Sequence, residues 1–422
     1  MRISAQHRVT KMVGRDPHES GRAATTLELF FDLVFVVAFS VAGVEVAHAL
    51  AEGHFFVAVA GFVFSTFAAI WAWINFSWFA SAFDTDDWFF RVTTLCQMIG
   101  VAVVALGIPA VFASLEERDH LDNRVLVLGY VIMRVAMSIQ WLRAAQASER
   151  YRGACLTYAV AIWIAQIGWI AVAITDLPFV QAALASLVLF FVELSGPVIA
   201  ENSKSGPTPW HAHHIAERYG LLTIITLGEG IVGTVAALQA VIGVEGWTFD
   251  TAILGLTGMT IPFAMWWMYF VVPTGEALHL RRRKCLVWGY GHIIIFMAAA
   301  AVGAGLHVAA LYIEHEAHIG AGVVAATVAI PLGIFCIGIL AIYDYLLDFD
   351  AVTLLLGGGA LVFLVGSVIL AAVGVSIVVA LVVAACAPIF IVIVDEMGGG
   401  ARRHTALERL AARADPADEA LQ

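Results

Sequence analysis

The stretch that decides the fold is LFFDLVFVVAFSVAGVEVAHAL, which runs from Leu29 to Leu50. Its length matches the roughly 20 residues that a helix needs to cross a hydrocarbon core about 30 Å thick. Its apolar residues are almost continuous and do not alternate with polar ones, which favours a transmembrane helix over a barrel strand. We therefore expect this stretch to be the first span of an integral membrane protein.

Similar apolar blocks recur along the whole chain of 422 residues, of which 61% are hydrophobic and 13% are charged. This composition leaves too few polar side chains to cover a soluble protein of that length. We expect an all-α fold with about twelve transmembrane helices, near residues 29–50, 56–79, 92–112, 124–142, 154–175, 178–199, 221–242, 252–272, 286–312, 320–343, 351–373 and 376–394.

The distribution of Lys and Arg predicts the orientation of the chain in the membrane. If the N-terminus is cytoplasmic, all but three of the 22 basic residues fall in cytoplasmic loops or tails; Arg118 and Arg124 lie outside, and Arg134 lies within a span. Because basic residues are retained on the cytoplasmic side, we expect both termini to be cytoplasmic. The formal net charge of −11 arises largely from acids on the predicted outer face, and no basic patch predicts nucleic-acid binding.

The spans divide into two sets of six, separated by a polar connector. We expect a cytoplasmic tail over 1–28, a first membrane half over 29–199, a connector over 200–220, a second half over 221–394 and a cytoplasmic tail over 395–422, which contains a short amphipathic helix. The halves align weakly, with Glu28 opposite Glu217 and Trp73 near Trp267. An even number of spans between them predicts a parallel internal repeat, a 6+6 arrangement with an axis along the membrane normal.

Ionisable residues inside spans are costly, so they usually pair, face the interior of a bundle or line a pathway. Glu28 and Asp32 lie four residues apart and therefore share one face of the first helix. Arg134 requires a carboxylate nearby, for which Glu193 and Glu229 are the candidates. The candidate solute- or proton-binding residues are Glu28, Asp32, Arg134, Glu193, Glu217, Arg218, Glu229 and His292.

Two interpretations of these residues remain open at this stage. They can form a static network of salt bridges that fixes the order of the helices. Alternatively, they can line a polar chamber in the cytoplasmic half of the membrane and exchange protons or bind a cation or a polar solute. A carboxylate in a low dielectric holds its proton more tightly, which suits proton transfer.

Several short motifs carry less weight. The segment Gly228-Glu-Gly-Ile-Val-Gly233 has the spacing of a dinucleotide-binding loop, but it lies inside an apolar span, where small residues favour close helix packing. His211-Ala-His213-His214 lacks the spacing of a metal site, and Asp84-Thr-Asp86-Asp87 lacks the glycine and glutamate of an EF-hand.

The five cysteines form no Cys-x-x-Cys pair, and no catalytic constellation is identifiable. We therefore expect no metal and no cofactor, and the sequence favours a protein without enzymatic activity. Several tryptophans, including Trp71 and Trp73, are candidates for interfacial belts or for packing.

The chain resembles the bacterial low temperature requirement A (LtrA) family. The resemblance is carried by Thr26-Leu-Glu28-Leu-Phe-Phe-Asp32-Leu-Val-Phe and by Glu217-Arg-Tyr-Gly-Leu-Leu-Thr-Ile-Ile-Thr-Leu-Gly228-Glu229. Supporting matches are Asp84-Thr-Asp86-Asp87 with Arg91, Arg134, Trp267-x-Tyr269-Phe270 and Tyr290-Gly-His292. The resemblance implies a multi-pass protein of a bacterial cytoplasmic membrane. The family name records a growth phenotype in the cold and implies no activity.

A fainter likeness concerns the segment Phe30-x-Asp32-x-Val34-Phe35-x-x-Ala38, which is similar to the first-helix signature of TMEM-type potassium channels. Those channels also use six-helix repeats. Phe31 occupies the position of the serine in that signature, and the seventh span lacks the signature, so a symmetric channel filter is not expected.

The leading hypothesis is a secondary transporter, proton-coupled or not, that moves a small polar solute or ion through an acidic cavity. Its expected partners are membrane lipid and that solute, with no nucleic acid; a homo-oligomer remains open. Two alternatives belong to other classes: a cation channel, and a membrane enzyme that modifies a lipid or an isoprenoid carrier.

Overall fold

The structure is a computed structural model that describes residues 9–175, 177–203, 206–348 and 351–412. Within these ranges the regular elements are helices, and twelve of them are long and apolar enough to cross a membrane. Their bounds are α1 (Thr26–Ala51), α2 (Phe55–Phe83), α3 (Trp88–Glu117), α4 (Arg124–Ala147), α5 (Arg152–Ile174), α6 (Phe179–Glu201), α7 (Ala212–Glu245), α8 (Phe249–Phe270), α10 (Cys285–Ile313), α11 (Ala321–Leu347), α12 (Ala351–Ala372) and α13 (Ile377–Glu396). The predicted number of spans is thereby confirmed.

Some helix boundaries differ from the predicted ones. α7 begins at Ala212, inside the connector predicted for 200–220. Its polar first turns are helical and precede the apolar block. Two short helical elements, α9 (Thr274–Leu280) and the 3₁₀ helix η1 (Arg282–Lys284), precede α10. The expected helix near the C-terminus is present as α14 (Gly399–Ala412).

Parts of the predicted tails and connector lie outside the described residues, namely 1–8, 204–205 and 413–422. They include Arg2, Arg8, Lys204 and Arg413, four of the basic residues whose distribution predicts cytoplasmic termini. The domain bounds, the internal repeat and the cytoplasmic placement of both termini stay predictions.

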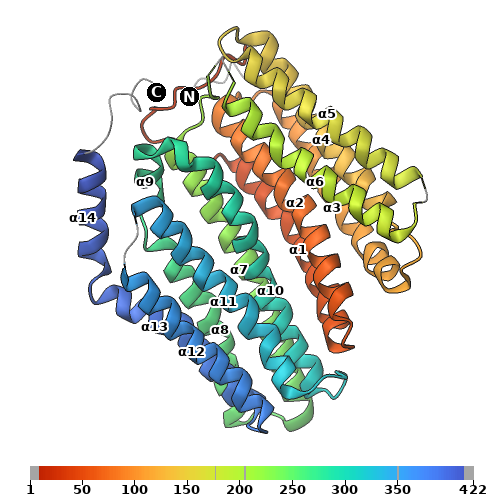
Figure 1. Ribbon diagram of the computed structural model, residues 1–422, viewed down its shortest axis with the longest axis vertical. Helices are drawn as coiled ribbons and strands as arrows, with labels where there is room; N and C mark the ends of the chain where they lie inside the picture. The colour runs from red at the N-terminus through yellow and green to blue at the C-terminus, as the bar shows by residue number, and fades with distance from the viewer. Residues whose placement is uncertain (1–8, 176, 204–205, 349–350, 413–422) are drawn as a thin grey trace. The chain divides into compact units, whose positions relative to one another are not determined.

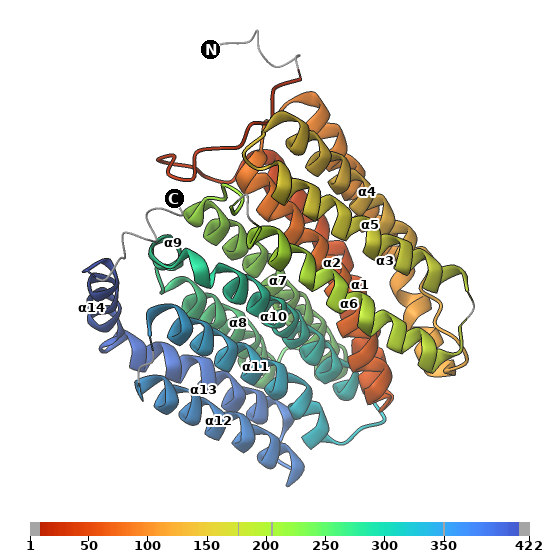
Figure 2. The same cartoon turned by 45° about the horizontal axis from the view of Figure 1, so that its top comes forward.

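The chain forms two compact units, each with its own packed interior. The described part of unit 1 comprises residues 9–41 and 64–218 with the gaps given above, and that of unit 2 comprises 42–63 and 219–412. In unit 1, α3, α4, α5 and α6 lie side by side in chain order (Figures 1 and 2). α3 and α4 approach closely where Gly100 and Gly129 have no side chains, since a Cβ at either glycine would collide with the other helix.

In unit 2, α10, α11, α12 and α13 pack in succession, and α13 also packs against α8. α7 meets α10 at Gly233 and Gly303, where a Cβ on either glycine would collide with the backbone of the facing helix. This contact confirms the interpretation of the glycine-rich segment as a helix-packing motif. Gly228, in contrast, has nothing within 4 Å of its Cβ position.

Candidate functional site

The principal cluster of unit 1 is built from two pairs of residues with the same helical spacing. Glu28 and Asp32 are four residues apart on α1, and His214 and Arg218 are four residues apart on α7, so each pair lies on one face of its helix. The two pairs face each other: His214 Nε2 lies 3.2 Å from Glu28 Oε1, and Arg218 Nη1 lies 2.8 Å from the same oxygen. The shared face predicted for Glu28 and Asp32 is confirmed.

Arg218 also binds Asp32, through two parallel contacts. Its Nε lies 3.1 Å from Asp32 Oδ2, and its Nη2 lies 2.5 Å from Oδ1. This forked geometry is the strongest arrangement that a guanidinium makes with a carboxylate. Trp73 on α2 donates its indole N–H to Asp32 Oδ1 at 2.6 Å, and the backbone N–H of Thr25 donates to Glu28 Oε2 at 2.7 Å.

All four side chains are shielded from solvent, with exposed fractions of 0% for Glu28, His214 and Arg218 and 1% for Asp32. Their formal charges do not balance, because two carboxylates face a single guanidinium. His214 can supply the missing positive charge when it is protonated, and its Nδ1 has no hydrogen-bond partner within the described residues. The cluster is therefore neutral with one added proton and negative without it.

Two further charged groups act on Glu28 from the edge of the cluster. Arg22 donates to the backbone carbonyl of Ala80 at 2.9 Å, and Asp84 lies in the segment between α2 and α3. Both interact electrostatically with Glu28, and they carry opposite charges. While Asp84 is ionised, the two charges cancel and leave the charge imbalance among Glu28, Asp32 and Arg218 unchanged.

Glu217 is not part of this cluster, although it is the neighbour of Arg218 in the chain. Its side chain is exposed, and Oε2 accepts a hydrogen bond from the backbone N–H of Ala24 at 3.0 Å. Successive residues of a helix point about 100° apart, which turns Glu217 away while Arg218 points inward.

A second buried cluster of unit 1 surrounds Glu193 on α6. Arg134 on α4 places Nη2 2.8 Å from Glu193 Oε2, which identifies Glu193 as the partner that Arg134 requires. Trp71 donates its indole N–H to Oε2 at 2.9 Å, Tyr130 donates its hydroxyl to Oε1 at 2.8 Å, and Gln166 donates its amide to Oε1 at 3.2 Å. Three helices, α2, α4 and α5, therefore donate hydrogen bonds to one carboxylate on α6.

Several buried polar atoms on α4, α5 and α6, the helices of this second cluster, lack hydrogen-bond partners among the described residues. They are Nε and Nη1 of Arg134, Oε1 of Gln166 and the hydroxyls of Ser138 and Ser186. Arg134 and Ser138 are one turn apart on α4. Buried polar atoms of this kind are usually satisfied by internal water.

The remaining candidates, His292 and Glu229, lie in unit 2. His292 is buried against Tyr219, Trp288 and Phe296; its Nε2 lies 3.1 Å from the hydroxyl of Tyr269, and its Nδ1 lies 2.8 Å from the carbonyl of Trp288. Glu229 is buried on α7. The single polar chamber expected for all eight candidates stays a prediction.

The acidic segment between α2 and α3 shapes the end of unit 1. Asp87 caps the N-terminus of α3 by accepting the N–H of Phe90, and it also accepts hydrogen bonds from Arg143 and from the N–H of Thr10. Although burial opposes ionisation, these bonds lower the pKa of Asp87. Asp84 differs, because burial and the nearby Glu28 carboxylate raise its pKa to about 6. The segment thus caps a helix, and Asp84 can change its charge near neutral pH.

Among the residues that the structure describes, no group of three or more His, Cys, Asp or Glu side chains is placed so that it could hold a metal ion. Within the histidine motif, His211 places Nε2 2.9 Å from the carbonyl of Glu19, and His214 faces Glu28.

Sequence reasoning missed the roles of His214, Trp71 and Trp73. The i,i+4 spacing of His214 and Arg218, which repeats that of Glu28 and Asp32, is the signal that could have identified His214. Both tryptophans are fully buried and donate to carboxylates, so neither belongs to an interfacial belt. Nothing in the spacing of the tryptophans could have shown which carboxylate each one meets.

One comparison with known proteins identifies the family of this chain. The family model described as "Bacterial low temperature requirement A protein (LtrA)" matches residues 23–388. A protein of Rhizobium meliloti (strain 1021), described as "Uncharacterized protein RA0937", is 27% identical over 252 residues; these cover 58% of this chain and 57% of that protein. The chain thus spans less than two thirds of the length of this relative. No solved structure matches the chain significantly.

Proposed function

The chain belongs to the bacterial low temperature requirement A family, and we propose that it is a proton-coupled secondary transporter of a small polar solute or ion. Its proton site is the cluster of Glu28, Asp32, His214 and Arg218. The membrane is the cytoplasmic membrane of the bacterium, and the cluster lies toward the cytoplasmic side.

The observation that carries this proposal is the unequal number of buried charges. Two carboxylates and one guanidinium lie together with almost no exposure, and an imidazole touches one of the carboxylates. An unbalanced charge in a low-dielectric interior costs several kcal/mol. A single proton on His214 or on a carboxylate removes the imbalance.

This charge arithmetic supplies a mechanism for coupling. With the added proton, the cluster is neutral and can stay closed to water. Without it, the cluster is negative and is stabilised by access to water or by a bound cation or solute with a hydrogen-bond donor. Arg218 stays attached to Asp32 through its forked contact, so Glu28 and His214 are the groups that exchange the proton.

The test uses the purified chain in proteoliposomes that contain a pH-sensitive dye. Solutes are added outside one at a time, beginning with K⁺, Na⁺, small amino acids, polyamines and sugars. We expect at least one of them to change the internal pH in a way that depends on its own gradient. An imposed pH gradient should in turn drive accumulation of the same solute.

Planar-bilayer recordings distinguish the transporter from the channel alternative. A coupled transporter gives no unitary currents, and its flux follows the proton gradient. Unitary cation currents that are indifferent to the proton gradient would overturn the proposal and identify a channel. A chain that moves neither protons nor any of these solutes in either assay would also contradict it.

A further inference from the structure

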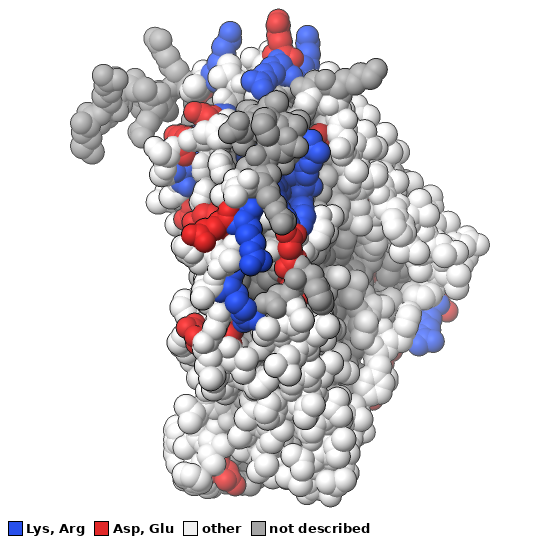
Figure 3. Space-filling view, turned by 60° about the vertical axis from the view of Figure 1, so that its left-hand side comes forward, with Lys and Arg blue, Asp and Glu red and all other residues white. Residues whose placement is uncertain are grey.

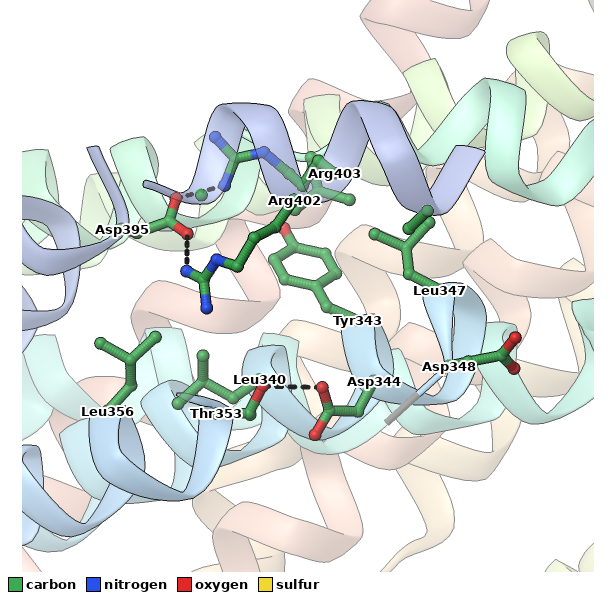
Figure 4. Close-up of a pocket in the computed structure, with 13 residues that line it drawn as sticks. Leu340, Tyr343, Asp344, Leu347, Asp348, Thr353, Leu356, Asp395, Arg402 and Arg403 are labelled. Atoms are coloured by element: carbon green, nitrogen blue, oxygen red, sulfur yellow. Dashed lines mark hydrogen bonds and ion pairs between the residues drawn. The ribbon is translucent and has the colours of Figure 1, made fainter. Parts of the chain in front are cut away.

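One end of unit 2 contains a mixed-charge hollow that the proposed function does not use. It lies where α8, α11 and α13 end, where α12 begins and where α14 packs, and its volume is about 100 Å³. About 15 Å³ suffices for one water molecule, so the hollow has room for a small polar group. Its polar side chains are those of Tyr343, Asp344, Asp348, Thr353, Asp395, Arg402 and Arg403, all labelled in Figure 4.

A second, smaller hollow of about 40 Å³ adjoins the first and is mainly apolar. The two share Leu340, Tyr343, Asp395 and Arg403, while Trp267 and Ile391 contribute to the wall of the second. A polar mouth is therefore continuous with an apolar slot at the end of the helices. An amphiphile with a charged head and an apolar tail has the same arrangement of polarity.

Four basic groups around the mouth, Arg281, Lys284, Arg402 and Arg403, meet its three carboxylates, Asp344, Asp348 and Asp395, and thus leave one positive charge for an anionic head. Arg403 is paired with Asp395 on α13, and Arg402 Nη2 lies 3.5 Å from the same carboxylate (Figure 4). The other carboxylates have partners of their own, because Thr353 donates to Asp344 at 2.7 Å and Arg281 binds Asp348 at 2.6 Å.

Further basic residues come from the segment Arg281–Lys284, in which Lys284 lies 3.9 Å from Asp348. Figure 3 turns the α14 side forward and shows Lys and Arg side chains intermingled with acids there, next to an extended surface without charges. Clusters of basic residues beside a transmembrane helix attract anionic lipids.

We propose that this hollow binds the phosphate of an anionic phospholipid, with Arg402 and Arg403 as its ligands and the apolar slot beside the lipid's tail. Guanidinium groups bind phosphate through parallel N–H···O contacts. A phosphate that enters the mouth competes with Asp395 for Arg403, so the lipid replaces an ion pair between α13 and α14. The inference is independent of the proposed transport activity.

The test measures lipid retention by native mass spectrometry and the Tm of the full-length chain in detergent. The probes are phosphatidylglycerol, the zwitterionic phosphatidylcholine and inorganic phosphate. We expect phosphatidylglycerol to be retained and to raise the Tm, and the other two to do neither. The double variant R402Q/R403Q should weaken phosphatidylglycerol binding by about tenfold or more, since each basic residue near an anionic head contributes roughly a fivefold factor.

Arg409→Gln is the matched control, because Arg409 lies on the same helix but is exposed and outside the hollow. Its binding should stay within about twofold of the native chain. Asp395→Asn keeps both arginines and removes the competing carboxylate, so it should bind phosphatidylglycerol more tightly. Asp395→Asn also decides the question if the double variant does not fold.

Four results would overturn the inference: equal binding by R402Q/R403Q and the native chain, an equal loss in R409Q, no tightening in D395N, or an equal Tm shift with inorganic phosphate alone. The R409Q result would indicate diffuse attraction to α14, and the phosphate result would indicate a free anion as the occupant.

Discussion

Trp71 and Trp73 donate their indole N–H groups to carboxylates of two different clusters from opposite sides of α2. Trp71 reaches Glu193 on α6 at 2.9 Å, and Trp73 reaches Asp32 on α1 at 2.6 Å. Two residues along an α-helix span about 200° of rotation, which directs the two indoles apart. α2 therefore holds Asp32 and Glu193 in a fixed register to each other.

Replacing Trp73 by Phe removes one donor from Asp32 and keeps an aromatic ring in place. Because hydrogen bonds to charged groups contribute about 1.5–3 kcal/mol, we expect the free energy of unfolding to fall by about 2 kcal/mol beyond the packing loss. Unfolding in detergent by chemical denaturant measures this change.

The matched control is Trp141→Phe, since Trp141 is also fully buried in unit 1 but its indole N–H has no partner in the described structure. It should show the packing loss alone. Equal losses in the two variants would mean that the Trp73 hydrogen bond contributes nothing.

The Arg134–Glu193 pair should show strong coupling. Removing one member of a buried ion pair costs about 3–5 kcal/mol, because the other charge is left buried. We expect Arg134→Gln and Glu193→Gln each to destabilise by that amount, and the double variant to destabilise by less than the sum of the two. A double-mutant cycle on the free energy of unfolding measures this coupling.

The exposed pair of Arg91 and Asp86, 2.7 Å apart and about half exposed, provides the comparison. Its coupling should stay below about 1 kcal/mol, as is usual for surface pairs. Additive losses at Arg134 and Glu193 would contradict the pairing.

Asp84 should make stability depend on pH. Its pKa is raised to about 6 in the folded chain, against 3.8 for an ordinary aspartate, first by burial and then by Glu28. The folded state therefore holds a proton that the unfolded state has released, and this contribution is full below pH 3.8. It is lost as the pH rises through 6.

The Tm of the native chain between pH 4.5 and 7.5 should carry this downward contribution, and Asp84→Asn should remove it. Asp87→Asn should leave the slope in this range as it is, because the pKa of Asp87 is lowered from 3.8 and its contribution is lost only at more acidic pH. A Tm profile unchanged by Asp84→Asn would exclude this assignment.

The glycine contact between α7 and α10 should be intolerant of side chains. Gly233→Leu places a side chain against the backbone at Gly303, so we expect a loss of several kcal/mol or failure to fold. Gly228→Ala, five residues earlier on the same helix, has open space at its Cβ and should be neutral or stabilising by up to about 1 kcal/mol. Expression level and Tm distinguish the two, and a well-folded Gly233→Leu would disprove the close approach.

Much of the fold could be predicted because a membrane restricts the choices. Apolar blocks of sufficient length specify spans almost without reference to tertiary contacts, and the twelve expected helices are present. Local helical spacing also placed Glu28 and Asp32 on one face. The need of a buried arginine for a carboxylate predicts Glu193 or Glu229 as the partner of Arg134, and Glu193 is the one in contact.

The composition of the site could be predicted only in part, because it depends on how the helices are rotated and which of them meet. Glu217 and Arg218 are adjacent and both ionisable, and only the packing of α7 decides that Arg218 is buried and Glu217 exposed. His214 lies in the predicted connector, so its contact with Glu28 depends on the earlier start of α7.

The central claim is that the cluster of Glu28, Asp32, His214 and Arg218 carries the coupled proton. The most direct measurement compares solute-driven pH changes in proteoliposomes for Asp32→Asn and for Glu217→Gln. Asp32→Asn leaves Glu28 as the one carboxylate opposite Arg218, so the cluster is neutral without an added proton. Glu217→Gln removes an exposed acid that lies outside the cluster. We predict that Asp32→Asn abolishes proton movement while the solute still binds, and that Glu217→Gln behaves like the native chain. Native proton coupling in a folded Asp32→Asn variant would contradict the account.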